Sequence, residues 1–257
     1  YHTQGAILMI AGDISVADGQ ADAKTLLAGL PGGAEPTVDY TLPAPPETRQ
    51  IILVDRPQAK QSAIQMGIRA YTLQNQQKFA GSLTSQILSA GIDSRLGRYV
   101  RAEKGYVYGV EGYFSPSRHA GAFLADTGTR FETTGPTIEA MLTVFDQMKA
   151  APVSKKELAD AKLRVAGGML MSMQTISEQA QQRVIGILNG YPIDYYDKYA
   201  ERIGQVTAAD VQSVLQQYVI DDKLNIIVVA PAKAVEAQLE KLGPVKVVPM
   251  PDGKADK

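Results

Sequence analysis

A proline-rich segment between residues 31 and 47 limits what this chain can fold into, because it separates a short first part from a long second part. The segment holds five prolines among small and polar residues: Pro31, Pro36, Pro43, Pro45 and Pro46. Proline fixes φ and lacks an N–H donor, so such a segment resists both helix and strand. We therefore expect a terminal βα remnant over residues 1–33, a linker over 34–47 and a complete domain over 48–257.

A long internal repeat supports this division. The apolar run Ala6–Ala11 recurs 219 residues later as Asn225–Ala230, and each run is followed by a helical pattern and then by Leu30-Pro31 or Gly243-Pro244. A repeat at this distance indicates that the chain starts inside the last strand and helix of one domain and then holds a full copy of that domain. We expect Ala6–Ala11 to be a buried strand.

The second part alternates strand and helix patterns in an order that favours one fold class. Arg49–Asp55 and Ala63–Arg69 read as strands, the latter with period-2 alternation, and Leu224–Ala230 reads as the last strand. The hairpin strands are expected at Tyr106–Phe114 and Gly121–Thr129, and the helices at Gln74–Ala90, from near Pro136, after the capping box Ser154/Glu157, around Ile176–Ile187 and after Thr207. The order predicts an α+β fold, with an antiparallel sheet and helices packed on one face.

Composition excludes several functions. The 26 basic and 27 acidic side chains give a net charge of −1, which creates no field to attract nucleic acid or an anionic membrane. The chain has no cysteine and only two histidines, His2 and His119. Zinc sites without cysteine usually need two or three histidines, so we predict no metal site in this chain.

Several short motifs then occur in a characteristic order. They are Ser94-Arg95-Leu96, the stretch Arg101 to Tyr108, Gly121–Thr129, Thr133-Thr134-Gly135-Pro136, Glu157-Leu158, and Ile203 to Val211. Together they resemble the second domain of zinc metallopeptidases of the pitrilysin/insulinase type, which include mitochondrial processing peptidase. The chain has no His-x-x-Glu-His motif, so the resemblance is to the inactive, non-metal half of that family.

The resemblance implies that this chain acts in proteolysis together with a second, zinc-bearing half of a peptidase. This chain would be the non-catalytic half, with Arg101 and Tyr108 binding the peptide substrate and Tyr108 also donating to the oxyanion. The zinc would lie in a partner half, on the same polypeptide or a separate subunit, and no nucleic acid or membrane partner is implied. The resemblance favours a periplasmic location, and the composition leaves the cytoplasm open.

Other interpretations of the same residues remain. Arg101 could pair with Glu103 or Glu111 on a solvated face, with Tyr108 half-buried in a sheet. At the level of function, the alternative is a scaffold subunit that binds a protein partner without proteolysis. We expect Arg95 to be a structural clamp at a helix end. The sequence also departs from the family at Gly97, where an aromatic residue is common.

Overall fold

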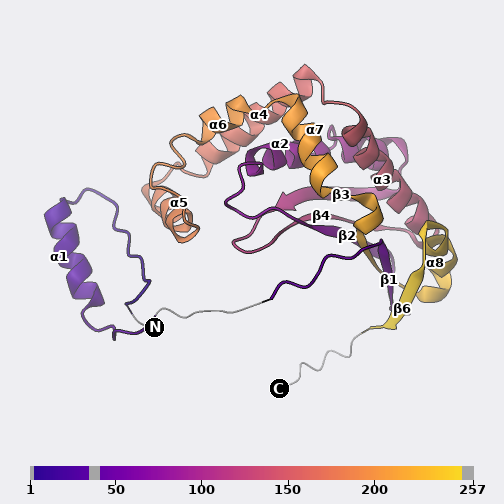
Figure 1. Ribbon diagram of the computed structural model, residues 1–257, viewed down its shortest axis with the longest axis horizontal. Coiled ribbons are helices and arrows are strands. Elements are labelled where there is room, and N and C mark those ends of the chain that lie inside the picture. Colours follow the sequence, from indigo (N-terminus) through magenta and orange to yellow (C-terminus); the bar gives the residue numbers. More distant parts are fainter. Residues whose placement is uncertain (1–2, 35–40, 251–257) are drawn as a thin grey trace. The chain divides into compact units, whose positions relative to one another are not determined.

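One mixed sheet organises the larger part of the chain. The computed structural model describes residues 3–34 and 41–250 (Figure 1). Within them, the strands lie in the order β3-β4-β2-β5-β1-β6. The strands are β1 (Gln50–Asp55), β2 (Ser62–Ala70), β3 (Val107–Ser115), β4 (Gly121–Thr129), β5 (Asn225–Ala230) and β6 (Val245–Pro249).

Helices fill the intervals between the strands. They are α1 (Val16–Leu27), α2 (Lys78–Ser89), α3 (Thr134–Ala150), α4 (Lys155–Met171), α5 (Ile176–Leu188), α6 (Tyr199–Gln205), α7 (Ala208–Tyr218) and α8 (Ala232–Leu239). A π-helix, Gly97–Glu103, follows α2. Reciprocal side-chain and backbone hydrogen bonds between Thr207 and Asp210 begin α7, and Ser154 and Glu157 make the same arrangement at α4.

The predicted α+β fold class is confirmed, but the sheet is not antiparallel throughout. Strands β3, β4, β2 and β5 pair antiparallel, whereas β1 pairs parallel with both β5 and β6. The chain leaves β5, passes through α8 and returns in the same direction as β6, and such a crossover produces parallel pairing. The sequence patterns did not predict β6, because Val245–Pro249 is short and contains proline.

The core lies on one face of the sheet. In β2 the buried positions Ile64, Met66 and Ile68 alternate with the exposed Ala63 and Gln65. The buried face packs against a layer that includes α2, α3, α7 and α8 (Figure 1). Full burial of one large apolar side chain contributes about 1.5–3 kcal/mol, so this layer determines which face of each strand points inward. The opposite face remains available for a site.

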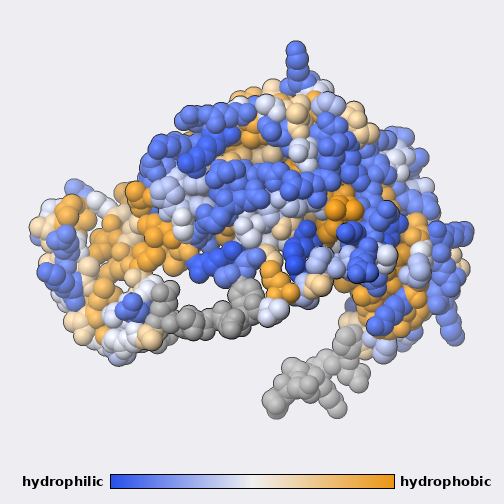
Figure 2. All heavy atoms as spheres, in the orientation of Figure 1, coloured by the Kyte–Doolittle hydropathy of each residue, from blue (hydrophilic) through white to orange (hydrophobic). Residues whose placement is uncertain are grey.

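The chain divides into two compact units. One comprises Tyr1–Pro43 and Ala166–Arg202, and the other comprises Ala44–Val165 and Ile203–Lys257, which hold the sheet. The first unit carries α1, α5 and the end of α4. Hydrophobic residues are exposed over α5 (Figure 2), among them Ile176, Ile185 and Leu188. The three-part division expected from the sequence differs from these units and stays a prediction.

The expected strand at Ala6–Ala11 is wrong. Ala6–Ala11 has no strand pairing in the structure, and its side chains Ile7, Leu8 and Ile10 are 37–43% exposed. An apolar run forms a strand only where a neighbouring strand satisfies its backbone N–H and C=O groups. The helix expected after it does form, as α1, which begins after the capping Ser15.

Candidate functional site

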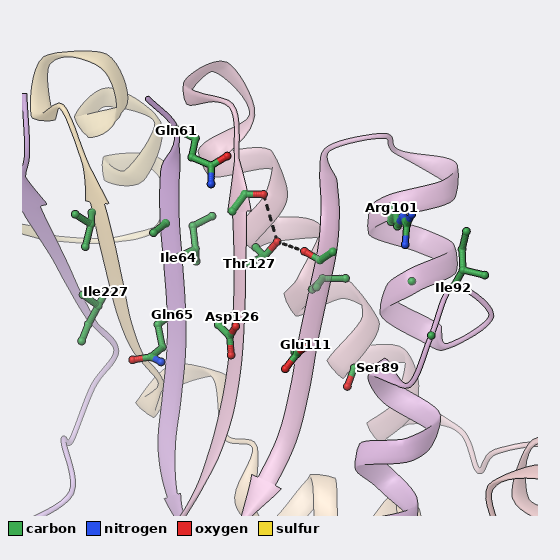
Figure 3. A pocket seen from close by; sticks show the side chains of 17 residues that line it. Gln61, Ile64, Gln65, Ser89, Ile92, Arg101, Glu111, Asp126, Thr127 and Ile227 are labelled. Atoms are coloured by element: carbon green, nitrogen blue, oxygen red, sulfur yellow. Dashed lines mark hydrogen bonds between the residues drawn. The ribbon is translucent and has the colours of Figure 1, made fainter. Parts of the chain in front are cut away.

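The uncovered face of the sheet forms one side of a groove of about 770 Å³. Its floor comes from β2, β3, β4 and β5, and its wall comes from the end of α2, the following loop and the π-helix (Figure 3). Both site residues predicted from the sequence lie at this groove. Arg101 lines it, and Tyr108 immediately precedes Gly109, which also lines it. This groove is the candidate site.

A glycine and a serine hold the wall in place. Ser94 is buried; its Oγ donates to the carbonyl of Gly91 over 2.6 Å and accepts from the N–H of Gly97. A Cβ at Gly97 would lie 2.4 Å from the carbonyl oxygen of Gly91 and 2.8 Å from that of Ile92. Only glycine therefore permits the loop to pack against the π-helix.

Arg101 lies near the end of the π-helix. Backbone hydrogen bonds from Lys104 to the carbonyl of Tyr99, and from Tyr106 to the carbonyl of Val100, give this segment a wider turn than an α-helix. Gly105 then adopts a φ of 64°, in the left-handed region, and the chain enters β3. This path places the guanidinium group of Arg101 next to the first residues of β3.

A β-bulge presents Tyr108. Val107 pairs with Thr129 and Val110 with Thr127, so Tyr108 and Gly109 together lie opposite Gly128 alone. A bulge of this kind bends the strand and redirects a side chain. Thr127 fixes the bulge, because its Oγ1 donates to the carbonyl of Gly109 over 2.6 Å (Figure 3). Tyr108 is 88% exposed.

The structure brings Arg101 and Tyr108 into direct contact. The guanidinium carbon of Arg101 lies 5.0 Å from the centroid of the Tyr108 ring, within the range of a cation–π interaction. Among the described residues, no ion pair joins Arg101 to Glu103 or Glu111. The exposure of Tyr108 also differs from the half-buried strand position that the alternative interpretation required.

Arg95 has the structural role expected of it. Its Nε and a terminal nitrogen donate to the two carboxylate oxygens of Glu157 over 2.6 and 2.9 Å. Burial raises the pKa of Glu157, but hydrogen bonds from Arg95 and Ser154 outweigh burial and hold this pKa at about 2. Arg95 therefore joins the start of α4 to the segment that precedes the π-helix.

The floor holds polar residues that the sequence analysis did not assign to the site. Glu111, Asp126 and Gln65 line the groove from three neighbouring strands. The available signal was the alternation of each strand, since Gln65 and Glu111 each lie between two buried neighbours and Asp126 follows the buried Ala125. Strand order was needed to bring them together.

The described residues do not fit a zinc ion. They contain no group of three or more His, Cys, Asp or Glu side chains with the geometry of a metal site. Carboxylates alone are a poor donor set for zinc, which proteins hold mainly through histidine and cysteine. We derive no zinc chemistry from this chain's own residues.

Comparison with known families identifies the fold. Residues 1–165 match the sequence pattern described as the peptidase M16 inactive domain. The chain belongs to this family. The resemblance to the inactive half of pitrilysin/insulinase-type peptidases is thereby confirmed. No protein of curated function has a matching sequence.

Solved structures share the fold of this M16 inactive domain. A peptidase M16 inactive domain from Pseudomonas fluorescens is 27% identical, with a TM-score of 0.78 over 87% of this chain and 53% of that one. The periplasmic protease PqqL from Escherichia coli is 14% identical, with a TM-score of 0.70 over 86% of this chain and 24% of that one. A chain of complex III2 from Candida albicans is 14% identical, with a TM-score of 0.71 over 91% and 57%. The present chain spans about half the length of the first structures it matches.

Proposed function

We propose that this chain is the non-catalytic half of a zinc metallopeptidase and that it binds the peptide substrate of a zinc-bearing half. The observation that carries the proposal is the contact between Arg101 and Tyr108 at the rim of an open groove. Membership of the M16 inactive-domain family supports it, because such a domain needs a catalytic half for proteolysis. The zinc-bearing half lies on the same polypeptide or on a separate subunit.

Arg101 and Tyr108 have different roles in this proposal. Arg101 offers a planar set of donors to peptide carbonyls, and so binds the substrate in its ground state. The exposed Tyr108 hydroxyl donates a hydrogen bond to the oxygen that gains negative charge during peptide hydrolysis. Arg101 also restrains the Tyr108 ring, which lowers the entropy lost when the hydroxyl engages the substrate.

Kinetics of the assembled peptidase test these roles. Tyr108→Phe removes one donor, so we expect kcat to fall by about 10²–10³ with KM little changed. Arg101→Ala removes ground-state binding as well, so we expect KM to rise and kcat to fall. Neither substitution should lower thermal stability appreciably, because Tyr108 is exposed and Arg101 only half-buried.

A matched control lies in the same π-helix. Lys104 lies 5.0 Å from the ring centroid of Tyr99, which is the same kind of contact, but neither residue lines the groove. Tyr99→Phe should therefore leave kcat and KM unchanged. Wild-type kinetics in both the Tyr108 and Arg101 variants, with an active zinc half, would overturn the proposal.

That outcome would favour a second function, a scaffold subunit that binds a protein partner without proteolysis. A chain of complex III2 shares the fold, which supports this alternative. The exposed Tyr108 and the Arg101 contact favour the peptidase proposal over it, because a scaffold does not require a hydroxyl at the rim of a groove.

We also propose a periplasmic location, as for PqqL, whose fold is similar. No helix among the described residues is long and apolar enough to cross a bilayer.

A further inference from the structure

Two carboxylates face each other on the open side of the sheet. Glu111 on β3 is the direct cross-strand partner of Asp126 on β4. Both line the groove, and Figure 3 shows them projecting from adjacent strands on the same side. Among the described residues, neither forms an ion pair. Like charges directly opposite each other destabilise a sheet, so this pair lowers stability unless a cation neutralises it.

The residues paired with this acidic pair on the next strands, β2 and β5, end in an apolar side chain. Asp126 pairs with Gln65 on β2, and Gln65 pairs with Ile227 on β5. Ile227 lies at the surface, and together with Ala63 and Val229 it forms an aliphatic floor inside the groove. Adjacent strands are about 4.8 Å apart, so Ile227 is about 10 Å from Asp126. The groove thus has an acidic end and an aliphatic end.

This pattern fits an extended peptide that carries one basic side chain. In an extended segment, side chains that face the same way are two residues apart, or about 7 Å. The length of a lysine or arginine side chain covers the remaining distance to the carboxylates. A groove of about 770 Å³ also has room for several residues, more than a single ion requires.

We propose that Glu111 and Asp126 make the groove selective for peptides with a lysine or arginine two residues away from an aliphatic residue. The proposal rests on the proposed peptide-binding function, and it adds the class of substrate. Arg101 projects from the wall beside β3, on the same side of the groove as Glu111, whereas the aliphatic floor on β5 lies farthest from it (Figure 3).

A divalent cation is the other ligand that two carboxylates attract. Calcium takes six to eight oxygen ligands, whereas this end of the groove offers two carboxylates and the amide of Gln65. The described residues contain no group of three or more acidic or histidine side chains suited to a metal. The aliphatic floor also has no role in binding an ion, which favours the peptide.

Peptide binding to the whole 257-residue chain tests the proposal. Fluorescein-labelled peptides of identical length, with Arg, norleucine or Glu at one position two residues away from a leucine, are titrated with protein and followed by anisotropy. We expect the Arg peptide to bind about tenfold more tightly than the norleucine peptide, and the Glu peptide to bind most weakly. In the double variant Glu111→Gln/Asp126→Asn, the Arg and norleucine peptides should bind equally. Added salt should weaken the preference of the wild type, because the pair is open to solvent.

A control variant separates the groove from overall charge. Glu139→Gln removes one carboxylate from the exposed side of α3, outside the groove, and should keep the tenfold preference. Equal binding of all three peptides by the wild type, no binding of the Arg peptide, or a preference that survives in the double variant would each overturn the proposal. Calcium chloride binding tightly on its own, measured by calorimetry and lost in the double variant, would overturn it in favour of a metal site. None of these outcomes decides the role of Tyr108, which the kinetics of the assembled peptidase test separately.

Discussion

The guanidinium group of Arg95 forms two parallel hydrogen bonds, of 2.6 and 2.9 Å, with the carboxylate of Glu157. Glu157 also accepts from the backbone N–H and the hydroxyl of Ser154, which starts α4. The pair is partly shielded, since the Arg95 and Glu157 side chains are 29% and 22% exposed. One ion pair therefore links a helix start to the wall of the candidate site, across 62 residues of sequence.

Loss of this ion pair should destabilise the fold. We expect Glu157→Gln to lower the free energy of unfolding by about 1–2 kcal/mol, because bidentate, partly buried pairs contribute more than exposed ones. Urea denaturation followed by circular dichroism measures the change. Lys156→Gln is the control, since it breaks an exposed pair with Asp160 on the same helix, and it should change stability by less than about 0.5 kcal/mol. Equal effects of the two variants would contradict the assignment.

The ionisation of Glu157 should contribute to the pH dependence of the free energy of unfolding. Its pKa is about 2 in the folded chain, against an ordinary value of 4.5, so folding favours the ionised form. Its contribution is complete above pH 4.5 and is lost as the pH falls toward 2. The free energy of unfolding of the wild type should therefore decrease more steeply between pH 5 and 3 than that of Glu157→Gln. Parallel pH profiles for the two proteins would show that Glu157 is not the responsible group.

Glycine 97 should be intolerant of a side chain. In Gly97→Ala the new Cβ would meet two backbone carbonyl oxygens, which cannot move without displacing the loop. We expect a loss of about 1–3 kcal/mol, as for other overpacked sites. Gly167 in α4 is the matched control, because a Cβ there meets nothing within 4 Å. Gly167→Ala should instead stabilise the chain by up to about 1 kcal/mol through helix propensity. A neutral or stabilising Gly97→Ala would contradict the close approach.

Local sequence patterns predicted the elements whose signals are local. The strand β4 matches its expected bounds, and the helix expected over Gln74–Ala90 forms as α2, which is followed by Gly91 with a φ of 89°. Contacts between residues far apart in the sequence could not be predicted from local patterns. The parallel pairing of Ile51 with Ile226 joins residues 175 positions apart, and no spacing in the sequence encodes its direction.

At the candidate site, too, two residues could be predicted from the sequence, but their arrangement depends on pairing between strands. Family motifs pointed to Arg101 and Tyr108, but the bulge that exposes Tyr108 depends on how β3 pairs with Gly128 of β4. Likewise, Glu111 and Asp126 become neighbours only once the register of the two strands is fixed. The apolar run Ala6–Ala11 failed as a strand for a related reason: the signal for a strand is local, whereas the partner that the strand needs is not.

The bulge at Tyr108 depends on Thr127. Its hydroxyl donates to the carbonyl of Gly109, and Thr127→Val removes this hydrogen bond while keeping the side chain's shape. We expect a cost of about 1 kcal/mol, concentrated in the bulge, so that amide hydrogen exchange at Tyr108, Gly109 and Val110 becomes about fivefold faster. In the assembled peptidase, turnover should fall less than in Tyr108→Phe, because the hydroxyl is still present but less well positioned.

Thr143 in α3 provides the control for this change. Its hydroxyl donates to the carbonyl of Glu139 over 2.8 Å, so Thr143→Val removes a similar bond far from the bulge in sequence. That variant should leave exchange at Tyr108 and the turnover of the peptidase as they are in the wild type. If Thr127→Val also left both unchanged, the bulge would be stable without the hydroxyl, and the ring of Tyr108 would be positioned by Arg101 alone.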